Sequence, residues 1–158
     1  MKTFSLLTLS LIISLTFFSC KKSDPGSAST TQNLSTWTIN GTAYSGDSSY
    51  VEYQNIGSYN KNSYATATGY TYISLSFANV PAAGTYTVIA GSNIPTGNTQ
   101  VALEAGVGNN DYLSTGATGD KITVTISGGK VVASFSNISV IQNGTTVKLS
   151  GTIIAAQQ

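Results

Sequence analysis

The stretch ITVTISGGKVVASF, residues 122–135, constrains the fold more than any other part of the chain. Its apolar residues alternate with Thr and Ser, the period of a strand with one buried face. The pair Gly128-Gly129 can take the positive φ values of a two-residue hairpin turn. A turn at these glycines opposes Ile122 to Phe135 and places the other apolar pairs on the same face. Because turn and alternation specify one register, the segment is predicted to be an antiparallel hairpin.

A second hairpin is predicted directly after the first. Its strands flank Asn143-Gly144, and the turn opposes Ile138 to Leu149 with their side chains on one face. The buried parity changes from odd positions at Phe135 to even positions at Ile138. A bulge, or a crossing between sheets, is therefore predicted at Ser136-Asn137.

The rest of residues 35–158 also has the period of strands, and no window has the period of a helix. One short hairpin about Asn40-Gly41 opposes Trp37 to Tyr44. Nine or ten strands are predicted in all, and short antiparallel strands must hide their edges. We therefore expect an all-β, antiparallel two-sheet β-sandwich, with a closed β-barrel as the alternative. The remaining predicted strands cover 70–78, 84–90 and 101–107, with short ones near 50–53 and 64–68.

Composition excludes several classes of function. The chain has seven Lys, no Arg and no His, and from residue 35 onward four lysines face five carboxylates. No basic patch can neutralise phosphates, so a nucleic-acid partner is not expected. Without His, the common nucleophile–base pairs and zinc or copper sites are not expected either. The glycines fit turns rather than a phosphate-binding loop, so the sequence predicts no catalytic residue, no metal and no cofactor.

The N-terminal residues are typical of an export signal that ends at a lipid anchor. Residues 4–18 are apolar and would span roughly 22 Å as a helix, too short for a comfortable membrane span. Ser19 precedes Cys20, the single cysteine, and this arrangement resembles the lipobox of bacterial lipoproteins. That resemblance implies a diacylglycerol on the Cys20 thiol, which would bind the protein to a membrane. A plain signal peptide with an incidental cysteine is the alternative. The predicted organisation is a signal peptide over 1–19, the lipidated cysteine and a flexible tether over 20–34, and one β domain over 35–158.

Three segments of the β region resemble lipoprotein domains of unknown function that are common in Bacteroidota. They are W-x-I-N-G-x-x-Y from Trp37, A-G-T-Y-T from Ala83, and I-T-V-T-I-S-G-G-K-V with its continuation from Ile122. The resemblance implies a lipid-anchored β domain and transfers no activity onto particular residues. The charged residues after Cys20 also resemble the surface-export signals of such lipoproteins. We expect the protein to be anchored in the outer membrane, on either its periplasmic or its surface face.

Five carboxylates remain as candidates for chemistry. Two of them could act as the acid and base of a glycoside hydrolase, and the segments 109–112 and 118–120 could supply oxygens to calcium. The simpler interpretation is that they are solvated loop or strand-face residues. They are Asp47, Glu52, Glu104, Asp111 and Asp120.

Tyrosine is the other conspicuous feature, since seven of the nine fall between residues 44 and 72 with Asn and Gln interleaved. Tyr70 and Tyr72 share parity opposite to Ile73 and therefore face away from the predicted core. Aromatic rings beside amide groups suit sugar rings, although tyrosine also covers outer sheet faces for structural reasons. The candidate glycan-binding residues are Tyr50, Tyr53, Tyr64, Tyr70 and Tyr72.

The sequence thus favours a non-enzymatic interaction or structural module of the cell envelope, whose partner would be an envelope protein. Glycan binding through the tyrosines is the alternative, and a carboxylate-dependent hydrolase is the third. Glycan binding requires several tyrosines on one open face, and a hydrolase requires two carboxylates about 5–10 Å apart.

Overall fold

The computed structural model describes residues 34–60 and 70–157. The predicted signal peptide, Cys20, nearly all of the predicted tether, and the predicted strand near 64–68 with Tyr64 lie outside the described residues. Within them, no helix is long and apolar enough to cross a membrane.

The described chain is all-β, as the sequence predicted. The described residues form eleven strands, more than the nine or ten expected. The strands are β1 (Ser35–Ile39), β2 (Thr42–Gly46), β3 (Ser48–Glu52), β4 (Asn55–Tyr59), β5 (Thr71–Phe77), β6 (Gly84–Ile89), β7 (Gln100–Val107), β8 (Asn110–Ser114), β9 (Lys121–Ser127), β10 (Lys130–Gln142) and β11 (Thr145–Ala156).

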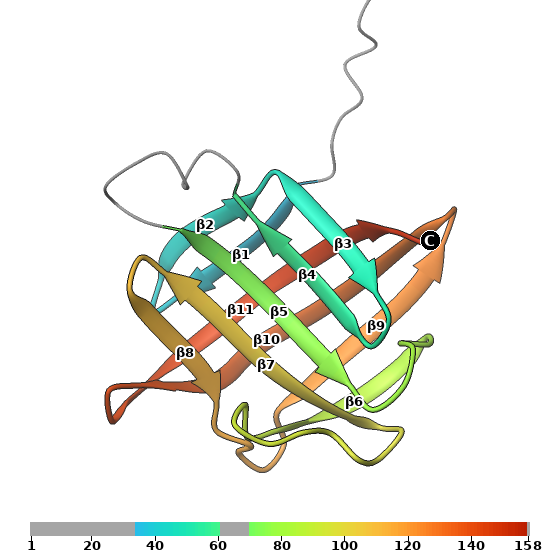
Figure 1. The fold of residues 1–158 in the computed structure, drawn as a ribbon. Helices are drawn as coiled ribbons and strands as arrows, with labels where there is room; N and C mark the ends of the chain where they lie inside the picture. Colours follow the sequence, from blue (N-terminus) through green and yellow to red (C-terminus); the bar gives the residue numbers. More distant parts are fainter. Residues whose placement is uncertain (1–33, 61–69, 158) are drawn as a thin grey trace, which may run out of the picture. The chain divides into compact units, whose positions relative to one another are not determined.

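The described strands do not form the two separate sheets expected from the sequence. All eleven are hydrogen-bonded into one sheet of order β2-β1-β11-β10-β9-β6-β7-β5-β4-β3, and β8 pairs with both β7 and β10. The sheet bends back on itself, so that β3, β4, β5 and β7 form a near layer and β11, β10 and β9 cross behind them (Figure 1). Pairing is antiparallel except between β6 and β7. This parallel pair corrects the expectation of antiparallel strands alone. The chain between β6 and β7 is long enough to carry β7 back to the same end, which a tight hairpin turn cannot do.

All three predicted hairpins form with the predicted registers, since Trp37 pairs with Tyr44 across β1 and β2, and Ile138 pairs with Leu149 across β10 and β11. Ser127 pairs with Lys130 and Ile122 with Phe135 across β9 and β10, and both turn glycines have positive φ, as the turn requires. The register between β10 and β11 shifts between Phe135 and Ile138. Asn137 takes a φ of +55° at that point, so the predicted irregularity is a bulge that lets one strand bury odd residues and then even ones.

Two strands, β4 and β8, were not predicted from the sequence. β4 reads NIGSY and β8 reads NDYLS, so neither has a sustained apolar alternation. Each is instead paired on both sides, β4 by β3 and β5, and β8 by β7 and β10. Their backbone hydrogen bonds, rather than their side-chain pattern, place them in the sheet.

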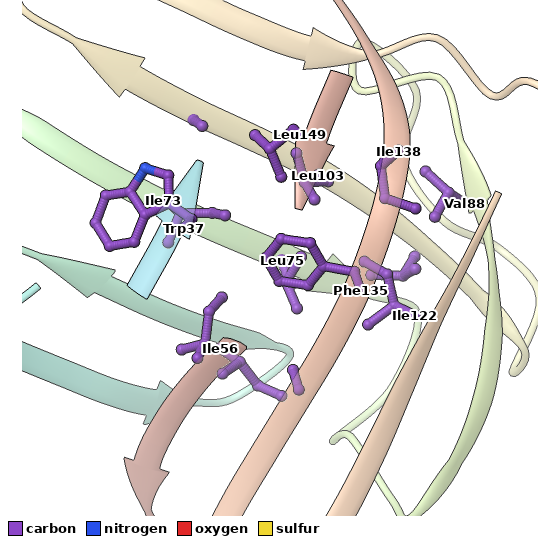
Figure 2. Close-up of a cluster of buried hydrophobic side chains, with 14 of the residues drawn as sticks. Trp37, Ile56, Ile73, Leu75, Val88, Leu103, Ile122, Phe135, Ile138 and Leu149 are labelled. Atoms are coloured by element: carbon purple, nitrogen blue, oxygen red, sulfur yellow. The ribbon is translucent and has the colours of Figure 1, made fainter. Parts of the chain in front are cut away.

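The core lies between the two layers. Ile73 and Leu75 of β5 and Leu103 of β7 meet Phe135 and Ile138 of β10 from the opposite side (Figure 2). Every apolar residue of the predicted hairpin face is inside or packed against this cluster. Burial of this one face therefore fixes which side of β5 and β7 looks outward, and that side carries the tyrosines.

Buried serines join the two ends of the sheet. The Oγ of Ser49 in β3 lies 2.8 Å from Ser35 Oγ in β1 and donates to Ser58 Oγ in β4 at 2.9 Å. Ser35 and Ser58 are almost fully buried, and Ser35 Oγ also accepts from the Ile154 amide at 2.9 Å. These bonds hold β3 beside β11 and keep the near layer in place over the core.

Candidate ligand-binding face

The outward side of β3, β4, β5, β7 and β8 carries the candidate site. Residues directly opposite each other on neighbouring strands share a face, so the registers define two rows across it. One row runs Tyr50, Gly57, Ser74, Glu104, and the next runs Tyr59, Tyr72, Gly106, Asp111. We call this surface, with Tyr70 at its border, the tyrosine face.

Two glycines let tyrosine rings lie down on this face. A Cβ on Gly106 would come within 2.0 Å of Tyr72 Cε1, and a Cβ on Gly57 would come within 2.3 Å of Tyr50 Cζ. Both rings therefore occupy the space that a side chain on the paired strand would fill. A ring that lies along the sheet covers the glycine backbone with one side and turns the other side outward.

Four rings follow one another across the face. Ring centroids are 6.5 Å apart from Tyr50 to Tyr59, 6.5 Å from Tyr59 to Tyr70, and 5.0 Å from Tyr70 to Tyr72. The last pair is stacked, with 27° between planes, and the other two pairs are tilted. We call this series the tyrosine ladder.

Tyr72 lies between two carboxylates at one end of the ladder. Its hydroxyl lies 2.5 Å from Glu104 Oε1 and 3.1 Å from Asp111 Oδ1. Burial raises the pKa of Tyr72 above its ordinary value, and the hydrogen bond to Glu104 and the two negative charges raise it further. The Tyr72 hydroxyl therefore keeps its proton and donates it to the neighbouring carboxylates. These hydrogen bonds hold the Tyr72 ring in place on the face.

At the other end of the ladder the face is hollowed. The open hollow has a volume of about 560 Å³, and the rings of Tyr50 and Tyr59 form two of its sides. Asn55 Oδ1 accepts a hydrogen bond from Ser76 Oγ at 2.8 Å. The amide nitrogen of Asn55 therefore points away from Ser76 and can donate hydrogen bonds. The lining is Ser48, Ser49, Tyr50, Glu52, Asn55, Tyr59 and Ser74.

Of the five tyrosines singled out in the sequence, Tyr50, Tyr70 and Tyr72 lie on the tyrosine face. Tyr53 lies in the turn between β3 and β4, with φ of +47° and 81% of its surface exposed. Tyr64 lies outside the described residues. Tyr59, absent from the candidate set, is a central member of the ladder. It lies on the outward side because β4 pairs it with Tyr72, and β4 was not predicted from the sequence.

The carboxylates separate into two groups. Glu52, Glu104 and Asp111 belong to the tyrosine face, whereas Asp120 accepts the Ser139 amide at 2.7 Å beside β10, and Asp47 lies between β2 and β3. Glu104 and Asp111, on the consecutive strands β7 and β8, have oxygens no more than 5.6 Å apart, the sum of their two distances to Tyr72. In the described chain, no three metal-ligating side chains come together.

One nucleophile–amine contact was missed in the sequence. Lys148 Nζ donates to Ser139 Oγ at 2.8 Å, from directly opposed positions on β11 and β10. Lys148 is exposed and Ser139 is buried. The lysine is the donor of this hydrogen bond, so the contact ties the two strands together.

Comparisons with family models, with curated proteins and with solved structures found no match for this chain. Interpretation of the tyrosine face therefore depends on its own geometry and charge.

Proposed function

We propose that this protein is a lipid-anchored cell-envelope lipoprotein of the Bacteroidota type that binds a glycan on its tyrosine face without converting it. The carrying observation is the tyrosine ladder, four neighbouring rings on the outward side of one layer. In this proposal Cys20 holds the lipid, and the domain over 35–158 acts as a β-sandwich whose two layers enclose the core. The periplasmic and surface faces of the outer membrane remain equal alternatives.

The chemistry of the face supports a glycan over a protein partner. Sugar rings stack their C–H faces on aromatic rings, and their hydroxyls bond to amide, hydroxyl and carboxylate groups. The ladder offers rings in sequence, and the hollow beside Tyr50 supplies Asn55, Glu52, Ser48 and Ser74. Glu52, Glu104 and Asp111 place charge at both ends of the ladder, whereas charged residues are depleted from the cores of protein–protein interfaces.

A glycan-binding screen of the purified full chain in detergent tests the proposal. The Tyr70→Ala/Tyr72→Ala variant is compared with Tyr53→Ala, which removes an exposed ring outside the ladder. Binding that the double variant loses and Tyr53→Ala keeps supports the proposal. If no glycan is retained by the unaltered chain, the tyrosines serve as sheet covering, and the envelope-protein alternative gains.

The anchor has its own test. Cells that express the chain are fed an alkyne-tagged fatty acid, and the purified protein is examined for the tag. We expect labelling of the unaltered chain and none of Cys20→Ala. Equal labelling of both proteins contradicts the assignment of Cys20.

A glycoside hydrolase is the second candidate, because oxygens of Glu104 and Asp111 lie within 5.6 Å of each other, and retaining enzymes hold their two carboxyl groups about 5–5.5 Å apart. Two features oppose it. The Tyr72 hydroxyl occupies the space between the carboxylates, where a substrate would have to bind, and Asp111 is exposed to solvent on an open sheet. Release of reducing ends that Glu104→Gln abolishes would favour the hydrolase over simple binding.

A further inference from the structure

We propose that the tyrosine face selects uncharged, hydroxyl-rich glycans and rejects those that carry carboxylate, sulfate or phosphate. This inference rests on the proposed glycan-binding function and adds the class of glycan. It follows from the charges and the hydrogen-bonding capacity of the face.

Charge on the face has one sign among the described residues. Glu52 borders the hollow, and Glu104 with Asp111 closes the other end of the ladder. The three described lysines are on β9, β10 and β11, which belong to the other layer; Lys61 lies outside the described residues. A glycan laid along the ladder therefore meets a carboxylate at each end, and an anionic substituent on it would be repelled.

Hydrogen bonding points in the same direction. Ionised carboxylates accept hydrogen bonds and cannot donate them. The Tyr72 hydroxyl, a donor that could have met an anion, is held by Glu104 and Asp111. The carboxylate lone pairs that Tyr72 does not use can bind only to hydrogen-bond donors on a ligand. The hydroxyl groups of an uncharged sugar are such donors.

The geometry of the ladder fits a chain rather than a single sugar. The 6.5 Å spacings from Tyr50 to Tyr59 and from Tyr59 to Tyr70 leave room for separate sugars to contact separate rings, whereas the stacked pair of Tyr70 and Tyr72, 5.0 Å apart, offers one shared platform. Both ends of such a chain would be under the influence of the carboxylates. Selection against charge should therefore extend along several sugar units.

The test uses pairs of polymers that share a backbone and differ in charge. They are hydroxyethyl cellulose with carboxymethyl cellulose, and dextran with dextran sulfate, in affinity electrophoresis against the full chain in detergent. We expect binding within at least one pair to favour the uncharged polymer by about fivefold to tenfold at low salt. Because counterions screen exposed charges, the preference should shrink as salt is raised.

A matched variant separates charge from shape. Glu104→Gln/Asp111→Asn keeps oxygens that can accept from Tyr72 and removes both charges. The ratio of uncharged to anionic binding should fall toward one in this variant, while circular dichroism shows the same β spectrum. Unaltered protein that holds the anionic member as tightly as the uncharged one overturns the selectivity alone. Absence of binding to all four polymers, combined with an empty glycan screen, overturns the proposed function and this inference together.

Discussion

Gly106→Ala tests whether the glycine makes room for Tyr72. A Cβ at residue 106 would lie 2.0 Å from Tyr72 Cε1 and 2.6 Å from Cδ1, far inside ordinary contact. The backbone can accept alanine because Gly106 is not among the positive-φ residues. The ring must therefore move off the face, and its hydroxyl must leave Glu104 and Asp111.

The magnitude follows from what the ring loses. A hydrogen bond to a charged group contributes about 1.5–3 kcal/mol, which we reduce to about 1–2 kcal/mol because exposed partners recover water. Replacement of glycine by alanine in an accessible conformation returns about 0.4–1 kcal/mol through the unfolded state. We expect a net loss of about 1 kcal/mol in the free energy of unfolding.

Gly84→Ala is the matched control. Gly84 is also a strand glycine without positive φ, and the nearest atom to its Cβ would be Tyr86 Cε2 at 3.9 Å. We expect this variant to gain about 0.5 kcal/mol. Urea unfolding at unchanged m-value measures both. Equal stability of the two variants would refute the reasoning, because it would mean that the Tyr72 ring has no fixed place over Gly106.

Three further predictions concern the core, the seam between β1 and β11, and the phenol. Leu103→Ala, at a fully buried position, should cost about 2–5 kcal/mol in urea unfolding; a cost below 1 kcal/mol would mean that the layers do not enclose it. Gly151→Ala places a Cβ 2.6 Å from the Thr36 carbonyl oxygen and 2.7 Å from Trp37 Cβ, so it should cost about 1–3 kcal/mol by overpacking, and unchanged stability would contradict the close approach of the strands. The raised pKa of Tyr72 means that the folded state holds this proton where the unfolded chain releases it, near pH 10. Its contribution to stability is therefore present below pH 10 and is lost as pH rises above it. In an absorbance titration at 295 nm, Tyr72→Phe and the unaltered protein should ionise equally until the fold is lost, and an extra ionising tyrosine near pH 10 in the unaltered protein would contradict this.

Much of the fold could be predicted where local signals agree. The Gly128-Gly129 and Asn143-Gly144 turns fix hairpin registers by themselves, and the alternation around them specifies the same faces. The parity change after Phe135 required an irregularity, and a bulge at Asn137 supplies it. By contrast, β4 and β8 carry little apolar alternation, and their place comes from partners far away in the chain.

The candidate site divides in the same way. Parity alone placed Tyr70 and Tyr72 on the outward side. It could not join Tyr72 to Glu104 and Asp111, which are brought together only when β5, β7 and β8 align. Parity could not place Tyr59 on this face either, because the residues of β4 do not alternate clearly enough to predict a strand there.

The sequence by itself determined an all-β domain, its two C-terminal hairpins and the side of β5 that faces water, because turn residues and a two-residue period act over a few neighbours. The tertiary structure alone decided the single bent sheet, the parallel pair β6–β7 and the assembly of the tyrosine face. These features depend on which distant strands pair. Many pairings satisfy the same short-range pattern, and only the burial of one common core together with complete backbone hydrogen bonding selects among them.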